Sequence, residues 1–188
     1  IREESPGATI CLCTAPIFAS IGFCDTFRVS PDISARWFNY TDNLKIGSCD
    51  IYHAAHEALR RQFMNRRFWV NDPDCLVVRS ADEEDDECSL AAKLRNEYTD
   101  NEAFLLAGIQ SLCGGVIVLS DKMSLLRGRK RLVEMSLPAR PVSARILDMF
   151  EKLRPSILHL QLDESHLLFG VANWEEDELV VDLGKDRY

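Results

Sequence analysis

Short apolar runs alternate with stretches of helical spacing along most of the chain. The runs are rich in Ile, Val, Leu and Cys and end near Pro, Ser or Asp, so they are typical of buried strands. They occupy residues 8–13, 20–24 (continuing into polar residues up to 32) and 116–119. A fourth apolar segment, residues 68–78, contains Pro73, which cannot donate to a strand ladder, so we expect that strand to end or bend there.

The segment at residues 48–66 has the periodicity of an amphipathic helix. One face collects the apolar side chains of Ile51, Ala55, Ala58, Leu59 and Phe63. Ser48 or Asp50 is the expected N-cap, because either side chain can accept a hydrogen bond from a free amide of the first turn.

Two further helices are predicted later in the chain. Thr99 and Glu102 have the spacing of a capping box and open a helix over residues 99–112, which Gly114 should end. A last amphipathic segment covers residues 128–136. The alternation of strands and helices up to residue 137 indicates a parallel β/α architecture.

The alternation of strand-like and helical segments ends after Pro141. Three strand-like runs, separated by turn residues and without a strong helix between them, occupy residues 157–162, 167–171 and 178–183. This pattern predicts an antiparallel β domain. We therefore divide the chain into residues 1–140 and residues 141–188.

About four strands precede the boundary, whereas a complete (β/α)8 barrel needs about 250 residues. If the parallel part belongs to such a barrel, it is the C-terminal half of a (β/α)8 TIM barrel, followed by the start of an antiparallel β domain. The chain begins with Ile1 and enters a strand-like run within ten residues. We therefore expect it to be the later part of a longer protein.

Composition narrows the class of protein and of partner. The chain has 188 residues, of which 46% are hydrophobic and 28% charged, as in an ordinary soluble globular protein. Its 22 Lys and Arg against 30 Asp and Glu give a net charge of −8, which argues against nucleic acid or an anionic membrane as the main partner. No apolar run is long enough to span a bilayer.

The seven cysteines are scattered through apolar stretches and do not have the spacing of a disulfide framework. This usage indicates a reducing compartment, so we expect a cytoplasmic protein.

Acidic residues follow several of the predicted strands. Asp32, the Asp72 and Asp74 pair, and Asp121 all stand at strand ends, where parallel β/α folds carry their active sites. Converging carboxylates suit proton transfer or attack at an acetal carbon, and a metal could also use them. Each Asp could instead belong to a turn or a helix cap. Arg28 lies four residues before Asp32 and could bind a sugar hydroxyl, tune the carboxyl, or form a simple ion pair.

Three segments share a pattern with a known enzyme family. Residues 13–32 read CTAPIFASIGFCDTFRVSPD, residues 69–79 read WVNDPDCLVVR, and residues 111–121 read SLCGGVIVLSD. They resemble, in the same order, the motifs C-G-x-P-L-x-x-S-I-G-x-x-D-x-M-R-I-G-P-D, W-x-N-D-P-D-C-L-x-x-R and A-L-S-G-G-x-x-x-L-S-D of glycoside hydrolase family 36, the melibiase-type α-galactosidases. Asn173-Trp174 with residues 182–184 resembles a strand pair of that family's C-terminal domain.

The resemblance implies a retaining α-glycosidase without a metal or organic cofactor. It maps the general acid/base to Asp32 and a galactose-contacting arginine to Arg28. We also expect Asp25, Asp72 and Trp69, which lie in the matching motifs, to bind substrate. The family's nucleophilic Asp belongs to a K-W-D-type motif that is absent from these 188 residues, so the chain alone should be inactive.

The sequence departs from the family pattern near the presumed sugar pocket. Thr14 stands where the family has Gly, and Ser30 replaces the Gly of R-I-G-P-D. Further departures are Phe18, Ala19, Ser34 and Arg36. The substrate could therefore differ from a plain α-galactoside.

Other candidate sites have equally plain structural interpretations. Cys49, His53 and His56 share a helix face and could bind a metal, but the same face could simply pack on a barrel. Trp37 and Trp69 could stack on a sugar or fill the core. The acidic run 82–87 lacks the pattern of a calcium loop. The sequence Asn39-Tyr-Thr41 matches a glycosylation sequon by spacing.

Three functions remain open. The first is hydrolysis of a small carbohydrate, an α-galactoside, by a longer parent protein that could be a homo-oligomer. The second is transfer of the galactosyl group to a sugar hydroxyl, as in raffinose synthases. The third is carbohydrate binding without catalysis.

Overall fold

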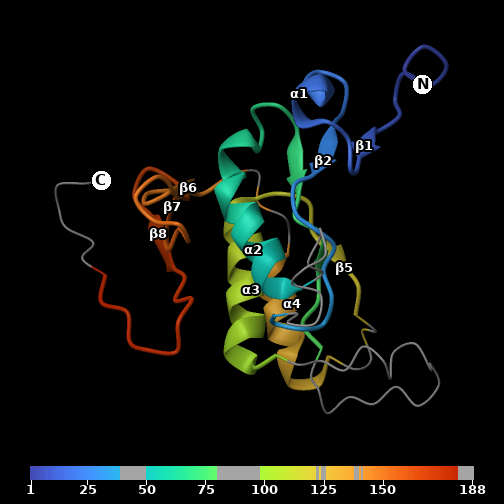
Figure 1. Ribbon diagram of the computed structural model, residues 1–188. Coiled ribbons are helices and arrows are strands. Elements are labelled where there is room, and N and C mark those ends of the chain that lie inside the picture. Colours follow the sequence, from blue (N-terminus) through green and yellow to red (C-terminus); the bar gives the residue numbers. More distant parts are fainter. Residues whose placement is uncertain are drawn as a thin grey trace.

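The computed structural model describes residues 1–38, 50–79, 98–121, 123, 126–137, 140 and 142–181. The fold is mixed α/β, with short parallel strands, helices beside them and one antiparallel sheet (Figure 1). The parallel strands do not close into a barrel within these residues. No helix in this part of the chain is long and apolar enough to cross a membrane.

The parallel strands form two small ladders. In the first, β1 (Cys11–Leu12), β2 (Thr26–Arg28) and β3 (Val70–Asp72) pair in the order β1-β2-β3. In the second, β4 (Cys75–Leu76) pairs with β5 (Val118–Leu119).

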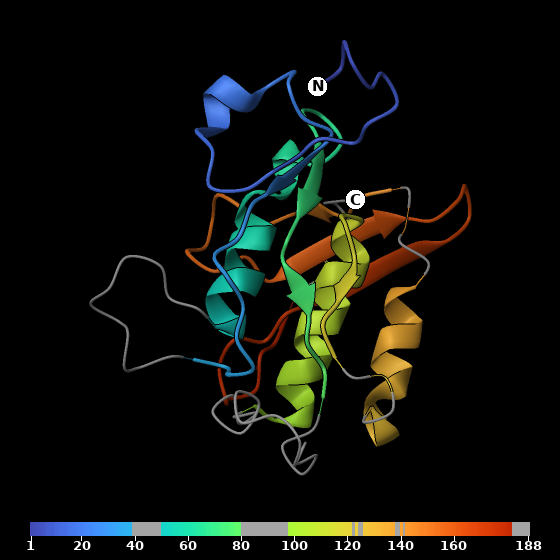
Figure 2. The ribbon, with the colours of Figure 1, turned by 90° about the vertical axis from the view of Figure 1, so that its right-hand side faces the viewer.

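Strands β3 and β4 follow each other through the middle of the molecule (Figure 2). They are separated by Pro73 and Asp74, so the predicted interruption at Pro73 is confirmed. The bend lets one continuous segment pair with β2 on one side and with β5 on the other.

The expected strand at residues 20–24 is wrong. Residues Ile17–Ser20 form the short helix α1, and the strand β2 begins only at Thr26. Pro16, whose ring fixes φ, precedes the helix, and Gly22 turns the chain with φ 84°. These two residues displace the strand toward the polar end of the apolar run.

The predicted helices are present, and the first is shorter than the predicted range 48–66. They are α2 (Ile51–Arg60), α3 (Asp100–Cys113) and α4 (Lys130–Ser136), with 3-10 turns at Gln62–Met64 and Arg127–Arg129. Asp50 caps α2 by accepting a hydrogen bond from the amide of His53. The chain tightens after Arg60, and Phe63 is consequently 44% exposed rather than buried on the helix face.

Helix α3 has the ends that its sequence predicts. Thr99 and Glu102 form the complete capping box, and Gly114 ends the helix in the left-handed conformation with φ 63°. The local chemistry of these residues therefore fixes both ends of the longest described helix.

The later part of the chain forms an antiparallel sheet. Its strands are β6 (Arg145–Ile146), β7 (Ile157–Gln161) and β8 (Leu167–Val171), in the order β6-β7-β8. The runs at 157–162 and 167–171 are thus confirmed. Residues 178–181 form no strand, contrary to the expectation for 178–183, and Val180 is 93% exposed; residues 182–188 lie outside the described part.

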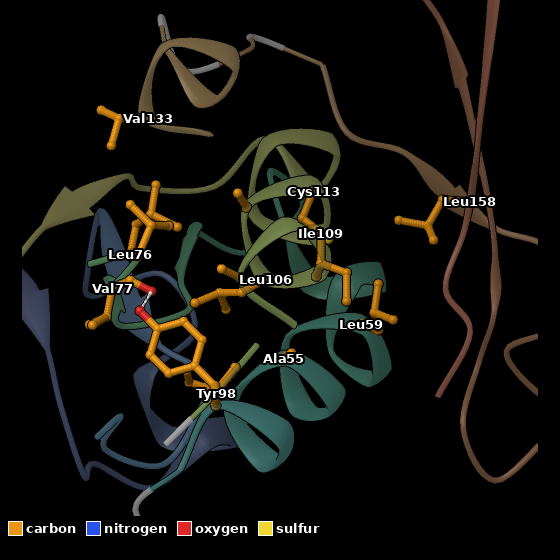
Figure 3. Packing of buried hydrophobic residues seen from close by; sticks show 14 of the residues in the cluster. Ala55, Leu59, Leu76, Val77, Tyr98, Leu106, Ile109, Cys113, Val133 and Leu158 are labelled. Carbon is orange, nitrogen blue, oxygen red and sulfur yellow. Dashed lines mark hydrogen bonds between the residues drawn. The ribbon is translucent and has the colours of Figure 1, made fainter. Parts of the chain in front are cut away.

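The main hydrophobic cluster joins the two parts of the sequence. Leu59 of α2, Leu106 of α3 and Leu158 of β7 are almost fully buried in it (Figure 3). Burial of one such side chain stabilises the fold by about 1.5–3 kcal/mol. The sheet and the helices therefore share a core, while the division at residues 140 and 141 stays a prediction.

Candidate functional site

Four charged side chains meet at the carboxyl ends of β2 and β3. Arg28 is the last residue of β2, and Asp72, the last residue of β3, is its register partner. Because the strands are parallel, both side chains leave the sheet at the same edge. Asp74 follows in the bend after β3, and Asp32 follows β2 by four residues.

Arg28 contacts all three carboxylates. Its Nε lies 3.2 Å from Asp72 Oδ2 as an ion pair without hydrogen-bond alignment. Its Nη1 lies 3.0 Å from Asp74 Oδ2 and donates a 3.4 Å hydrogen bond to Asp32 Oδ1. We name these four residues the Arg28 cluster.

The members of the cluster differ in exposure. The side chains of Asp72 and Asp74 are each 9% exposed and that of Arg28 is 20% exposed, whereas that of Asp32 is 76% exposed. Asp32 is therefore the carboxylate that an incoming ligand can reach most directly. The other two lie beneath it and hold the guanidinium.

The electrostatics of the cluster fix the charge of Arg28. Burial disfavours the guanidinium, but the carboxylates of Asp72 and Asp74 outweigh it and raise the pKa of Arg28. The cluster contains three carboxyl groups and one guanidinium, and the two that hold Arg28 from below, Asp72 and Asp74, already outnumber this cation when Asp32 carries a proton. Such a site suits a neutral or cationic ligand better than an anion.

Asp74 has an unusual local structure. Its backbone lies in the left-handed region with φ 71°. Its amide donates to Asp72 Oδ1 at 2.9 Å, its Oδ1 accepts from the amide of Cys75 at 2.7 Å, and its Oδ2 accepts from the amide of Ile33 at 2.7 Å. Asp74 thus contacts both the strand bend and the loop that carries Asp32.

The backbone beneath the cluster is also fixed. The amide of Val29 donates to the carbonyl of Asp72 at 2.9 Å, which extends the pairing of β2 and β3 beyond the ladder. The carbonyl of Asn71 accepts from the amide of Val116 at 2.8 Å. The end of β3 is therefore held from two sides.

Trp69, expected at the substrate, lies before β3 and inside the core. Its side chain is stacked on Phe27 with ring centroids 4.5 Å apart, and the residue is 4% exposed. The indole N–H donates to Asn71 Oδ1 at 3.0 Å. This arrangement corresponds to the core interpretation of Trp69, and the structure does not bring it into the Arg28 cluster.

Asp25, also expected at the substrate, stands at the opposite end of β2 from Arg28. It accepts hydrogen bonds from the amide of Ile10 at 2.8 Å and from Arg2 at 2.9 and 3.0 Å. The Ile10 hydrogen bond, and then that from Arg2, lower the pKa of Asp25. Its contacts join the N-terminal segment to β2.

Cys75 and Asp121 lie at the second parallel ladder, Cys75 in β4 and Asp121 two residues after β5. Asp121 Oδ2 accepts from the amide of Val78 at 2.6 Å, and burial raises the pKa of this carboxyl. Burial, followed by a hydrogen bond with Asp74, raises the pKa of the Cys75 thiol to about 11, so it is no thiolate nucleophile at neutral pH.

The proposed metal ligands do not form a site in the described residues. His53 Nδ1 lies 2.9 Å from both carboxylate oxygens of Asp50, and His56 Nε2 lies 2.8 Å from the carbonyl of Leu153. Among the described residues, no group of three or more His, Cys, Asp or Glu side chains is arranged to hold a metal ion. Three other candidates lie outside the described residues: Cys49, the acidic run 82–87 and the sequon at 39–41.

Trp37 lines a groove that contains none of the residues of the Arg28 cluster. Its ring stacks on Trp174 with centroids 6.4 Å apart. The groove has a volume of about 1380 Å³ and lies along α3 and β8, with Phe104, Leu168 and Phe169 in its lining. The cluster residues do not line it, so its size carries no argument about their chemistry.

The polar residues around Pro73 are evident in the sequence, but the contact between Asp74 and Ile33 is not. The two residues are 41 positions apart, and no local pattern encodes such a hydrogen bond. The available signal was an Asp, a residue that tolerates positive φ, placed directly after Pro in a strand.

Compared with models of known protein families, the chain matches none. Its function must therefore be inferred from the motifs in the sequence and from the geometry of the Arg28 cluster.

Proposed function

We propose that this chain supplies the acid/base side of the active site of a retaining α-glycosidase, an α-galactosidase in the first instance. In this proposal it is the C-terminal half of a catalytic (β/α)8 barrel with the start of an antiparallel β domain. The observation that carries it is the hydrogen bond of 3.4 Å between Arg28 and the exposed Asp32, at the carboxyl edge of parallel strands.

The proposed reaction assigns a separate task to each residue. Asp32 protonates the leaving oxygen of the glycoside, and its carboxylate then activates the water that releases the sugar. A nucleophilic carboxylate from an earlier part of the parent protein forms the covalent glycosyl intermediate, and in retaining enzymes the two carboxyl groups stand about 5–5.5 Å apart. The chain alone therefore catalyses nothing.

Arg28 and Asp72 bind substrate in this proposal. The part of the guanidinium not held by carboxylates donates to a sugar hydroxyl, and Asp72 accepts from another. The excess of carboxylates disfavours sugars that carry a carboxylate or a phosphate. A neutral glycoside is consequently the expected substrate, and Asp25 and Trp69 support the strands around it.

The test is hydrolysis of 4-nitrophenyl α-galactoside by the full-length parent and its Asp32→Ala variant, each with and without azide. We expect the variant to lose about 10²- to 10⁴-fold in kcat, which is the usual contribution of a general acid/base. Azide needs no general base, so it should restore turnover by attacking the β-linked glycosyl intermediate in place of water, and it should yield the α-linked galactosyl azide. Asp177→Ala, which removes an exposed carboxylate outside the Arg28 cluster, is the control and should retain activity.

A parent that is active but whose Asp32→Ala variant is unaffected, or is not rescued by azide, contradicts the assignment of Asp32. A sugar acceptor added to the same assay identifies a transferase, because the product then becomes an oligosaccharide instead of free galactose.

Carbohydrate binding without catalysis is the second candidate, and two departures from the family motif favour it. Thr14, at a family glycine position, has φ 54°. Ser30, at another, buries a hydroxyl without a hydrogen-bond partner among the described residues. A parent that binds galactose but hydrolyses no α-glycoside would identify such a relative.

A further inference from the structure

We propose that Asp74 is a positioning residue that fastens the loop carrying Asp32 to the bend between β3 and β4. The inference rests on the proposed function for its catalytic consequence. The tether itself depends only on contacts within the chain.

The first contact is a hydrogen bond to the loop backbone. Asp74 Oδ2 accepts from the amide of Ile33, the residue directly after Asp32, at 2.7 Å. The side chain of Asp74 is 9% exposed, so little water competes for this bond. Because the acceptor is a carboxylate, the bond is stronger than one between neutral groups.

The second contact passes through Arg28. The same oxygen of Asp74 lies 3.0 Å from Arg28 Nη1, and that nitrogen also donates to Asp32 Oδ1 at 3.4 Å. Asp74 therefore holds the main chain beside Asp32 directly and its carboxylate through the guanidinium. Asp32, which is otherwise largely exposed, is restrained at two points.

The backbone of Asp74 prepares its side chain for this role. With φ 71° it occupies a left-handed conformation that is unfavourable for most residues and that Asp, Asn and Gly tolerate best. Its other oxygen accepts from the amide of Cys75 at 2.7 Å, and its own amide donates to Asp72 Oδ1 at 2.9 Å. The carboxylate is thus fixed before it reaches the loop.

These contacts lead to a definite consequence for the proposed reaction. A displacement of a catalytic group by about 1 Å can lower the rate about 10²-fold. Loss of the tether should lower kcat while KM changes little, because Arg28 keeps Asp72 as a partner and can still bind the sugar. Asp74 is not assigned any contact with the substrate.

The test compares Asp74→Ala with Asp74→Asn in the full-length protein. Asn tolerates the left-handed backbone and can keep an acceptor toward the Ile33 amide, whereas Ala loses the acceptor and fits the backbone poorly. Hydrogen–deuterium exchange of the peptide that contains Ile33 is measured alongside kcat and KM. We expect faster exchange at Ile33 and an approximately 10²-fold lower kcat in Asp74→Ala, with both effects substantially smaller in Asp74→Asn.

The exchange measurement separates this proposal from the proposed function. Unchanged exchange at Ile33 in a folded Asp74→Ala variant overturns the tether whether or not the protein is an enzyme. Equal losses of kcat in the two variants, with exchange protected in Asp74→Asn, also overturn it, because the negative charge and not the tether then matters. If Asp74→Ala fails to fold, the Asp74→Asn variant tests the proposal. Fast exchange of the Ile33 amide together with full kcat contradicts the positioning role. A protected Ile33 amide together with a retained kcat supports it. If the parent is inert on every α-glycoside, the proposed function fails and the exchange result alone decides the tether.

Discussion

Thr14 has a backbone conformation that its own side chain disfavours. Its φ of 54° lies in the left-handed region, where Cβ crowds the backbone and β-branched residues are outliers. The residue is exposed, so its side chain gains little from packing in return. The chain therefore carries strain at the second residue after β1.

We expect Thr14→Gly to stabilise the protein by about 1 kcal/mol, because relief of the left-handed strain exceeds the entropy that glycine adds to the unfolded chain. The measurement is the urea midpoint at unchanged m-value. Thr14→Ala is the control, since alanine keeps a Cβ and should give no comparable gain. A lower midpoint for Thr14→Gly would contradict the strain.

The contact between the end of α3 and the end of β3 leaves no room for a side chain. A Cβ on Gly115 would clash with the carbonyl oxygen of Asn71, a backbone atom that cannot rotate away. Within α3, by contrast, a Cβ on Gly108 would have Met135 Cε at 4.0 Å as its nearest neighbour. The two glycines thus have opposite requirements.

Gly115→Ala should therefore destabilise the protein by about 1–3 kcal/mol, the range for overpacking, because β3 must move. Gly108→Ala is the matched control and should be neutral or stabilising by up to about 1 kcal/mol, since alanine is the better helix former. Urea unfolding of both variants provides the check. Equal effects of the two substitutions would refute the close approach of β3.

The elements that were predicted correctly are those whose ends are determined by residues close to them in the sequence. Thr99 with Glu102 and Gly114 specify the two ends of α3, and Pro73 specifies the strand bend. Strand β2 was misplaced because the apolar residues before it belong to α1 and a turn. Strand β6 is two residues long, too short for any periodicity to reveal.

Two exposed carboxylates contribute to the response of the fold to acid. The amide of Ile10, and then Arg2, lower the pKa of Asp25; the amide of Ser165, and then His166, lower that of Asp163. A carboxyl with a lowered folded-state pKa stabilises the fold above its unfolded value of about 3.9, and this stabilisation is lost as the pH falls through the folded value.

The double variant Asp25→Asn, Asp163→Asn should therefore be less stable than the parent at pH 7, and the difference should narrow below about pH 4. Urea midpoints at pH 7 and pH 3 measure it. A difference of the same size at both pH values would show that the carboxylate charges contribute nothing.

The part of the site that follows from strand topology could be predicted from the sequence. Parallel strands deliver their last residues to one edge, which brings Arg28 of β2 and Asp72 of β3 together. Membership of a motif did not reveal that Asp25 stands at the other end of β2, or that Trp69 is covered by Phe27. Such facts depend on strand bounds and on packing between distant segments, which neither periodicity nor motif spacing contains.

The left-handed backbone of Asp74 also restricts how this position can drift by mutation. Single-base changes convert an aspartate codon into codons for Asn, Gly, Ala, Val, Glu, His or Tyr. Among these replacements, Asn and Gly accept the backbone most readily, and Asn alone of the two retains an acceptor for the Ile33 amide. Among single-base changes at residue 74, only the change to Asn therefore preserves both the backbone conformation and the acceptor.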